Sequence, residues 1–143
     1  MTPTASLEVR RVVHASVERV FAAWTDPSLI QAWWGPGGVT CPGAEVDLRI
    51  GGAYRIGNQM PDGNVAWIVG RFERVEPPRL LVYSWRFEPG PEAESRVTVR
   101  FEPHPDGTQV IVLHEKIPGE AMRAEHLAGW SGCLDGLASY LAG

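Results

Sequence analysis

The apolar residues of this chain follow two repeating patterns, one with a period of two and one with a helical period. The period of two is clearest over residues 95–102, where Val97, Val99 and Phe101 alternate with polar residues. Such alternation is typical of a β-strand with one buried face. With Gly and Pro clusters such as 35–38 and 89–91 as turns, the pattern predicts strands over residues 7–13, 40–48, 52–60, 65–75, 79–87, 95–102 and 108–115.

Helical spacing appears after the first predicted strand and again at the C-terminal end. Apolar residues between positions 17 and 24 recur every three or four residues behind Ser16, a suitable N-cap. Asp26 followed by Pro27 is a second helix start and predicts a short helix over 27–33. The last 24 residues carry one apolar stripe, which predicts a long helix over 120–142: Leu127, Trp130, Leu134, Leu137 and Leu141.

The predicted order of elements restricts the fold. A helix with a single apolar stripe must bury it, and the sheet is the large partner that this chain offers. Twisted antiparallel strands tend to curl, so we expect the long helix on the concave side of the sheet, with a ligand cavity between them. The sequence therefore predicts an α+β fold: a curved seven-stranded antiparallel sheet around a long C-terminal helix, with two short helices after the first strand.

Composition narrows the class of protein. The 143 residues predict a single domain over 1–143, and 44% hydrophobic with 21% charged residues is ordinary for a soluble domain. The net charge of −4 argues against a nucleic-acid partner, and no apolar run is long enough for a membrane helix. Cys41 and Cys133 lie far apart and outside any CxxC motif, which argues against a zinc ribbon or a redox dithiol. With no secretory signal in the sequence, we expect a cytoplasmic protein with reduced thiols.

Several short segments then carry a family resemblance, and they occur in family order over roughly residues 7–142. They are residues 20–27 (VFAAWTDP), 33–36 (WWGP), 47–54 (DLRIGGAY), 74–80 (RVEPPRL), 83–85 (YSW), 107–108 (GT), 114–115 (HE) and 129–130 (GW). This set resembles the START/Bet v 1-like (SRPBCC) superfamily, and within it the branch similar to the C-terminal domain of the activator of Hsp90 ATPase.

The resemblance implies a helix-grip fold, in agreement with the order of elements predicted above. It implies less about chemistry, because members of the superfamily bind hydrophobic small molecules, cyclise polyketides, sequester toxic compounds or assist a chaperone. No shared catalytic motif exists to carry over, so the sequence assigns no catalytic residue. The question of whether this chain is an enzyme stays open.

His114 is the first polar candidate for a site. It shares a strand face with Val110 and Val112, and that face could lie beneath the final helix. There the imidazole could contact a ligand or act as a general base, or it could serve only as a structural hydrogen-bond partner. His126 lies one helical turn before Trp130, at the edge of the apolar stripe. Two histidines without a third ligand do not make a metal site, so we predict no metal and no cofactor.

Aromatic side chains supply the rest of the predicted site. Six tryptophans in 143 residues could be core packing, or some of them could line a cavity for a flat apolar ligand. If Ile68 and Phe72 face inward, parity turns Trp67 outward, so Trp67 is the least secure member. The predicted ligand-binding residues are Trp67, Phe72, Trp85, His114, His126 and Trp130.

The leading functional hypothesis is a small-molecule binding protein with a mostly apolar cavity between sheet and C-terminal helix. One alternative is a cyclase- or hydrolase-like enzyme with His114 as general base. Another is a co-chaperone-like module that binds a protein through the Trp33–Trp34 region, provided that these indoles are exposed. The identity of the ligand, a homodimer and a protein partner stay open at this point.

Overall fold

The computed structural model describes residues 4–35, 38–88 and 94–142. Two of the four residues of the turn predicted at 35–38, and all of the cluster at 89–91, lie outside these residues. Within them, ten elements follow one another in the predicted order, from an N-terminal strand to a long C-terminal helix.

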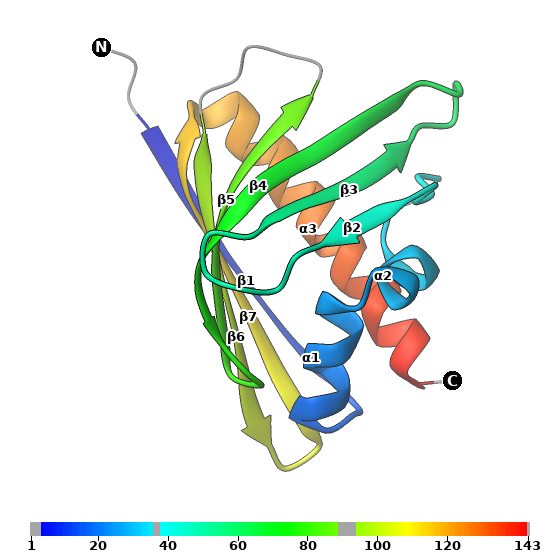
Figure 1. Cartoon of the computed structure of the whole chain (residues 1–143), viewed down its shortest axis with the longest axis vertical. Coiled ribbons are helices and arrows are strands. Elements are labelled where there is room, and N and C mark those ends of the chain that lie inside the picture. Colours follow the sequence, from blue (N-terminus) through cyan, green and yellow to red (C-terminus); the bar gives the residue numbers. More distant parts are fainter. Residues whose placement is uncertain (1–3, 36–37, 89–93, 143) are drawn as a thin grey trace.

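The strands form one seven-stranded sheet in the order β1-β7-β6-β5-β4-β3-β2, and all neighbouring strands are antiparallel. Their bounds are β1 Thr4–Val13, β2 Ala44–Val46, β3 Ala53–Gln59, β4 Val65–Glu76, β5 Leu80–Glu88, β6 Ser95–His104 and β7 Gly107–Pro118. The sheet curves, and its concave side faces the helices (Figure 1). The predicted α+β helix-grip fold is confirmed.

The second strand is shorter than the predicted 40–48. Thr40 forms only an isolated bridge with Gln59, and the ladder with β3 begins at Ala44. Pro42, which has no N–H to donate, interrupts the pairing between these two points. Beyond Val46 the chain turns away through hydrogen bonds such as Gly52 N–H to the carbonyl of Arg49, at 2.9 Å.

The two short helices start where the capping residues predict. Ser16 accepts a hydrogen bond from the Arg19 N–H at the start of α1 (Val17–Thr25). Asp26 accepts one from the Ser28 N–H, at 2.9 Å, at the start of α2 (Pro27–Trp33). These side chains satisfy N–H groups that a helix leaves free at its first turn.

The C-terminal helix α3 (Glu120–Ala142) crosses the concave side of the sheet (Figure 1). Its backbone approaches β1, β7 and α2 most closely. Trp130, Leu134, Leu137 and Leu141 of the predicted stripe are buried, whereas Leu127 is half-buried near the beginning of the helix. Among the described helices, none combines the length and apolar character needed to cross a membrane.

The orientation of β7, which the sequence left ambiguous, decides the position of the predicted polar candidate. Val110, Val112 and His114 are completely buried on the concave side, and the Trp130 side chain of α3 is hydrogen-bonded to His114. Their neighbours Ile111 and Leu113 point to the convex side, where they lie beside charged residues of β1 and β6. His114 therefore lies under the helix rather than on the surface.

Shortening a stripe residue tests whether the helix is gripped by the sheet. Leu134 is only 1% exposed, so Leu134→Ala should lower the free energy of unfolding by about 2–5 kcal/mol, the usual cost of a large-to-small core change. Urea denaturation followed by tryptophan fluorescence measures this difference. A loss below about 0.5 kcal/mol, the range of ordinary surface substitutions, would show that α3 does not pack as described.

Candidate functional site

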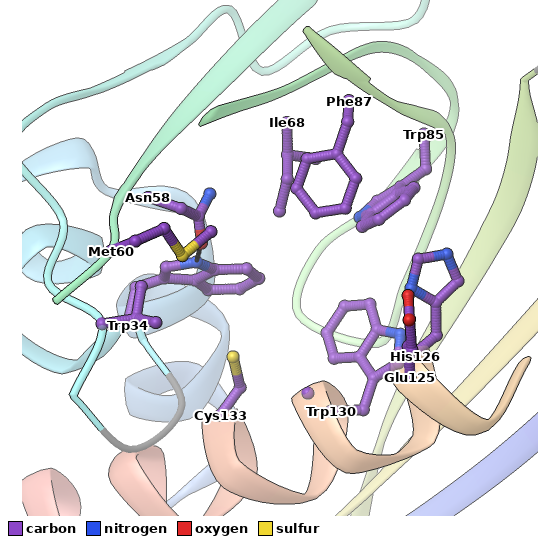
Figure 2. Close-up of a pocket in the computed structure, with 12 residues that line it drawn as sticks. Trp34, Asn58, Met60, Ile68, Trp85, Phe87, Glu125, His126, Trp130 and Cys133 are labelled. Atoms are coloured by element: carbon purple, nitrogen blue, oxygen red, sulfur yellow. Dashed lines mark hydrogen bonds between the residues drawn. The ribbon is translucent and has the colours of Figure 1, made fainter. Parts of the chain in front are cut away.

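A cavity of about 300 Å³ lies between the middle of α3 and strands β3, β4 and β5 (Figure 2). Most of its lining is apolar and aromatic, and Glu125 at its rim is exposed to solvent. The lining residues are Trp34, Val39, Asn58, Met60, Ile68, Trp85, Phe87, Glu125, His126, Gly129, Trp130 and Cys133.

Two glycines of α3 explain why the space is at this point of the helix. Gly129 and Gly136 are seven residues apart, so they face nearly the same direction. A Cβ on Gly136 would lie 2.8 Å from the carbonyl oxygen of Trp33, because α2 comes that close to α3. A Cβ on Gly129 would have no neighbour within 4 Å. On this side the helix is thus in close contact with α2 at Gly136 and leaves open space at Gly129.

A chain of hydrogen bonds connects the helix to three strands behind the cavity. The Trp130 indole N–H donates to His114 Nδ1 at 3.0 Å, and His114 Nε2 lies 2.7 Å from Ser95 Oγ. The Ser95 hydroxyl donates to the backbone carbonyl of Trp85 at 3.1 Å. Since an indole nitrogen can only donate, Nδ1 must accept, and the proton of the neutral ring is on Nε2. Every donor in this chain has an acceptor.

These bonds restrict the chemistry of His114. Burial, followed by the nearby His126, lowers the pKa of His114 to about 3, so the ring is neutral at physiological pH. Its single basic nitrogen is occupied by Trp130, and the residue is not among those that line the cavity. His114 therefore has no lone pair that could remove a proton from a molecule in the cavity.

His126 lies between this buried chain and the cavity. Its ring stacks on that of His114, with 4.9 Å between centroids, and Trp85 packs edge-on against it at 4.6 Å. Burial lowers the pKa of His126, while the charge of Glu125 opposes this shift. Together with Trp85 and Trp130, His126 forms an aromatic wall on one side of the cavity (Figure 2).

The opposite wall contains one buried polar group, the amide of Asn58. Its Oδ1 accepts from the Trp34 indole N–H at 2.9 Å, and its Nδ2 donates to the carbonyl of Ile56 at 3.1 Å. Cys133 also faces the cavity, but burial raises the pKa of its thiol to about 12. A thiol in that state is not a nucleophile near neutral pH.

The structure brings half of the sequence-predicted ligand residues to this cavity. Trp85, His126 and Trp130 line it, and His114 lies directly behind them. Phe72 faces the same side of the sheet, but it packs with Tyr54 and Tyr83 beside a separate, much smaller space. Trp67 lies on the opposite side of the sheet from Ile68, with the Arg55 guanidinium 4.2 Å above its ring.

Sequence reasoning did not propose Trp34, Asn58, Met60 and Gly129 as lining residues. Trp34 and Gly129 both belong to family-like motifs, whereas Asn58 and Met60 carried no signal in the sequence. The Trp33–Trp34 surface that a protein-binding module would need is not formed, because these indoles are only 4% and 7% exposed. In the described part of the chain, no group of three or more His, Cys, Asp and Glu side chains is arranged to hold a metal ion.

Fold and cavity together define a class: a helix-grip domain in which a curved sheet and its C-terminal helix border a small apolar space. Residues 14–142 match the family model described as "Activator of Hsp90 ATPase homolog 1-like protein". This match spans most of the sequence, and the chain belongs to that family, within the START/Bet v 1-like superfamily.

Solved structures agree with this assignment. Protein CV1439 from Chromobacterium violaceum is 28% identical with a TM-score of 0.86, over 95% of this chain and 96% of that one. The AHSA1 protein SPO3351 from Silicibacter pomeroyi is 28% identical with a TM-score of 0.83, over 96% and 98%. CalU16 from Micromonospora echinospora is 33% identical with a TM-score of 0.71, over 94% and 73%. No curated protein matches the chain by sequence.

The role of His114 can be tested through the pH dependence of stability. His114→Gln should lower the free energy of unfolding near pH 7 by about 1–3 kcal/mol, because it leaves buried partners unpaired. The unfolded chain takes up a proton on this histidine near pH 6.5, whereas the folded chain resists protonation down to a pKa of about 3. The wild type therefore loses stability relative to the variant as pH falls below about 6.5. The difference between their free energies of unfolding should shrink with it.

Urea unfolding at several pH values between about 7 and 4.5, where the unfolded histidine titrates, measures this effect. His14→Gln, at an exposed position, is the matched control and should differ little from the wild type. A wild-type advantage over His114→Gln that stays constant across the range would contradict the neutral, buried imidazole.

Proposed function

We propose that this protein binds a small, flat, hydrophobic molecule in the cavity between α3 and the sheet. The observation that carries the proposal is the cavity itself, with three tryptophans and a phenylalanine around about 300 Å³ of space. Ligand pockets typically range from about 300 to 1,000 Å³ and combine apolar walls with few polar groups. The cavity is at the low end of that range, so it suits a compound of two or three fused rings.

Two of the groups at this site that could take part in catalysis, His114 and Cys133, are not available for proton transfer. Proton transfer needs a group with a free lone pair or an acidic proton near the ligand. His114 has both nitrogens engaged, and the thiol of Cys133 is protonated. The alternative of a cyclase or hydrolase with His114 as general base is therefore not supported by this arrangement.

A ligand screen tests the proposal directly. A compound that binds only the folded state raises stability by about 2.7 kcal/mol at one hundred times its Kd, equal to several degrees in Tm. We expect shifts with planar bicyclic and tricyclic aromatic compounds, and smaller ones with fatty acids. Sterols, which are larger, serve as the size control. Differential scanning fluorimetry gives the Tm, and the absence of any shift across flavonoids, aromatic polyketides and fatty acids would overturn the proposal.

Filling the cavity from the helix should abolish binding without unfolding the protein. Gly129→Leu places a side chain in open space, and leucine is a better helix former than glycine by about 0.7–1 kcal/mol. We expect a Tm equal to or above that of the wild type and no ligand-induced shift. Ala128→Leu, at the neighbouring exposed position, adds the same side chain outside the cavity and should keep the shift. Equal ligand shifts in both variants would mean that the compound binds elsewhere.

A further inference from the structure

The indole N–H groups of the buried tryptophans are almost all used inside the protein. Four of them donate: Trp24 to Tyr83 Oη at 3.3 Å, Trp33 to the carbonyl of Ala23 at 2.7 Å, Trp34 to Asn58 Oδ1 at 2.9 Å and Trp130 to His114 Nδ1 at 3.0 Å. The fifth, Trp85, is 7% exposed, and its Nε1 has no partner. Within the described residues, it is the only buried side-chain nitrogen or oxygen in that condition.

The packing of Trp85 prevents its ring from turning to find a partner. Its ring lies edge-on against three others, with centroid separations of 4.7 Å to Phe87, 4.9 Å to His114 and 4.6 Å to His126. Its backbone carbonyl is held by the Ser95 hydroxyl. The nitrogen edge of the ring points toward the middle of the cavity (Figure 2). Buried donors without acceptors are rare in folded proteins because they are costly, so this one needs an explanation.

We propose that the Trp85 N–H is the polar recognition group of the cavity, and that it donates to the oxygen of an uncharged, carbonyl-bearing aromatic ligand. This inference rests on the proposed function and adds the class of ligand. The other two tryptophans of the lining, Trp34 and Trp130, already donate to Asn58 and His114, so Trp85 is the indole left to meet a ligand acceptor.

The charges around the cavity select a neutral acceptor over an anionic one. None of the described lining residues is Lys or Arg, and Glu125 places a negative charge at the rim. His126 is the nearest basic group, and its burial disfavours the protonated form. A carboxylate would therefore lose its hydration without gaining a counter-ion, whereas a ketone needs only one hydrogen bond.

A matched pair of ligands isolates this single hydrogen bond. Fluorene and 9-fluorenone are planar, uncharged tricyclic compounds that differ only by a methylene in place of a carbonyl. The wild type should bind fluorenone about tenfold more tightly, since a net hydrogen bond corresponds to roughly this ratio of Kd values. Fluorenone-4-carboxylate should bind at least about tenfold more weakly than fluorenone, for the reason of charge given above. Titration followed by tryptophan fluorescence or calorimetry gives the Kd values.

Two Trp→Phe variants then locate the donor. In Trp85→Phe the preference for fluorenone should fall to about twofold or less, because the donor is gone. Trp34→Phe is the matched control: it removes an indole from the same cavity, but one whose N–H is bonded to Asn58. It should weaken both ligands by a similar factor and keep their ratio.

A spectroscopic readout on the wild type keeps the test independent of the variants. The ¹H–¹⁵N spectrum resolves indole N–H signals, and that of Trp85 should move downfield with fluorenone but not with fluorene. The signals of Trp34 and Trp130 should respond alike to both compounds, because the two ligands have similar ring currents.

The outcomes separate the inference from the proposed function. A fluorenone preference that disappears in Trp85→Phe and persists in Trp34→Phe supports the role of Trp85 as the donor. A selective shift of the Trp85 signal supports that role as well. Equal binding of fluorene and fluorenone to the wild type leaves the apolar site standing and overturns the role of Trp85. Tighter binding of the carboxylate overturns the preference for uncharged ligands. If no compound binds the wild type, the proposed function and this inference fall together.

Discussion

The hydrogen bond from Trp130 to His114 fixes the long helix on the sheet, and the rest of the site depends on it. Apolar packing alone lets a helix slide or rotate on a sheet, because burial of apolar area has no direction. A buried indole N–H needs an acceptor at one distance and angle, and the neutral imidazole supplies it. Ser95 and the backbone of Trp85 extend this connection from β7 across β6 to β5. The position and rotation of α3 on the sheet are thereby fixed.

With α3 held in this position, the cavity results from uneven packing along the helix. Gly136 allows close contact with the end of α2, so the helix is tight at its C-terminal half. In the middle, Gly129 presents no side chain to the space in front of β4 and β5. The large rings of Trp34, Trp85 and Trp130 surround this space without filling it. Rigid aromatic walls keep a cavity open because their rings cannot collapse into it without losing their own contacts.

The same hydrogen bonds bear on the kind of function that such a site supports. A histidine in a pocket is a natural candidate for acid–base chemistry, but here its two nitrogens hold the fold together. The polar groups that remain toward the cavity are few: an amide already bonded twice, the His126 ring in the wall, the Glu125 carboxylate at the rim and one indole donor. Sparse polar groups on apolar walls are typical of sites that hold a molecule and orient it. Members of one fold family differ in such details, which is why the family assignment alone does not set the chemistry.

The sequence by itself determined the order of elements, the position of the long helix and the fold class. These features depend on local signals: the alternation of Val97, Val99 and Phe101, the caps at Ser16 and Asp26, and the apolar stripe through Leu134. Local pattern also placed Trp85, His126 and Trp130 on faces that meet. It could not decide which face of β7 is buried, because both faces are partly apolar. Nor could it show that the ends of the predicted strand 40–48 lie outside the β2 ladder.

Only the tertiary structure decided which polar atoms are paired and where space remains. Trp34 reaches Asn58 across 24 residues, and Trp130 reaches His114 only because α3 folds back over β7. Gly129 and Gly136 are the same residue type on the same helix, and their opposite roles depend on what lies opposite each of them. Hydrogen-bond partners and cavities are properties of elements brought together from distant parts of the chain, so no local pattern in the sequence records them.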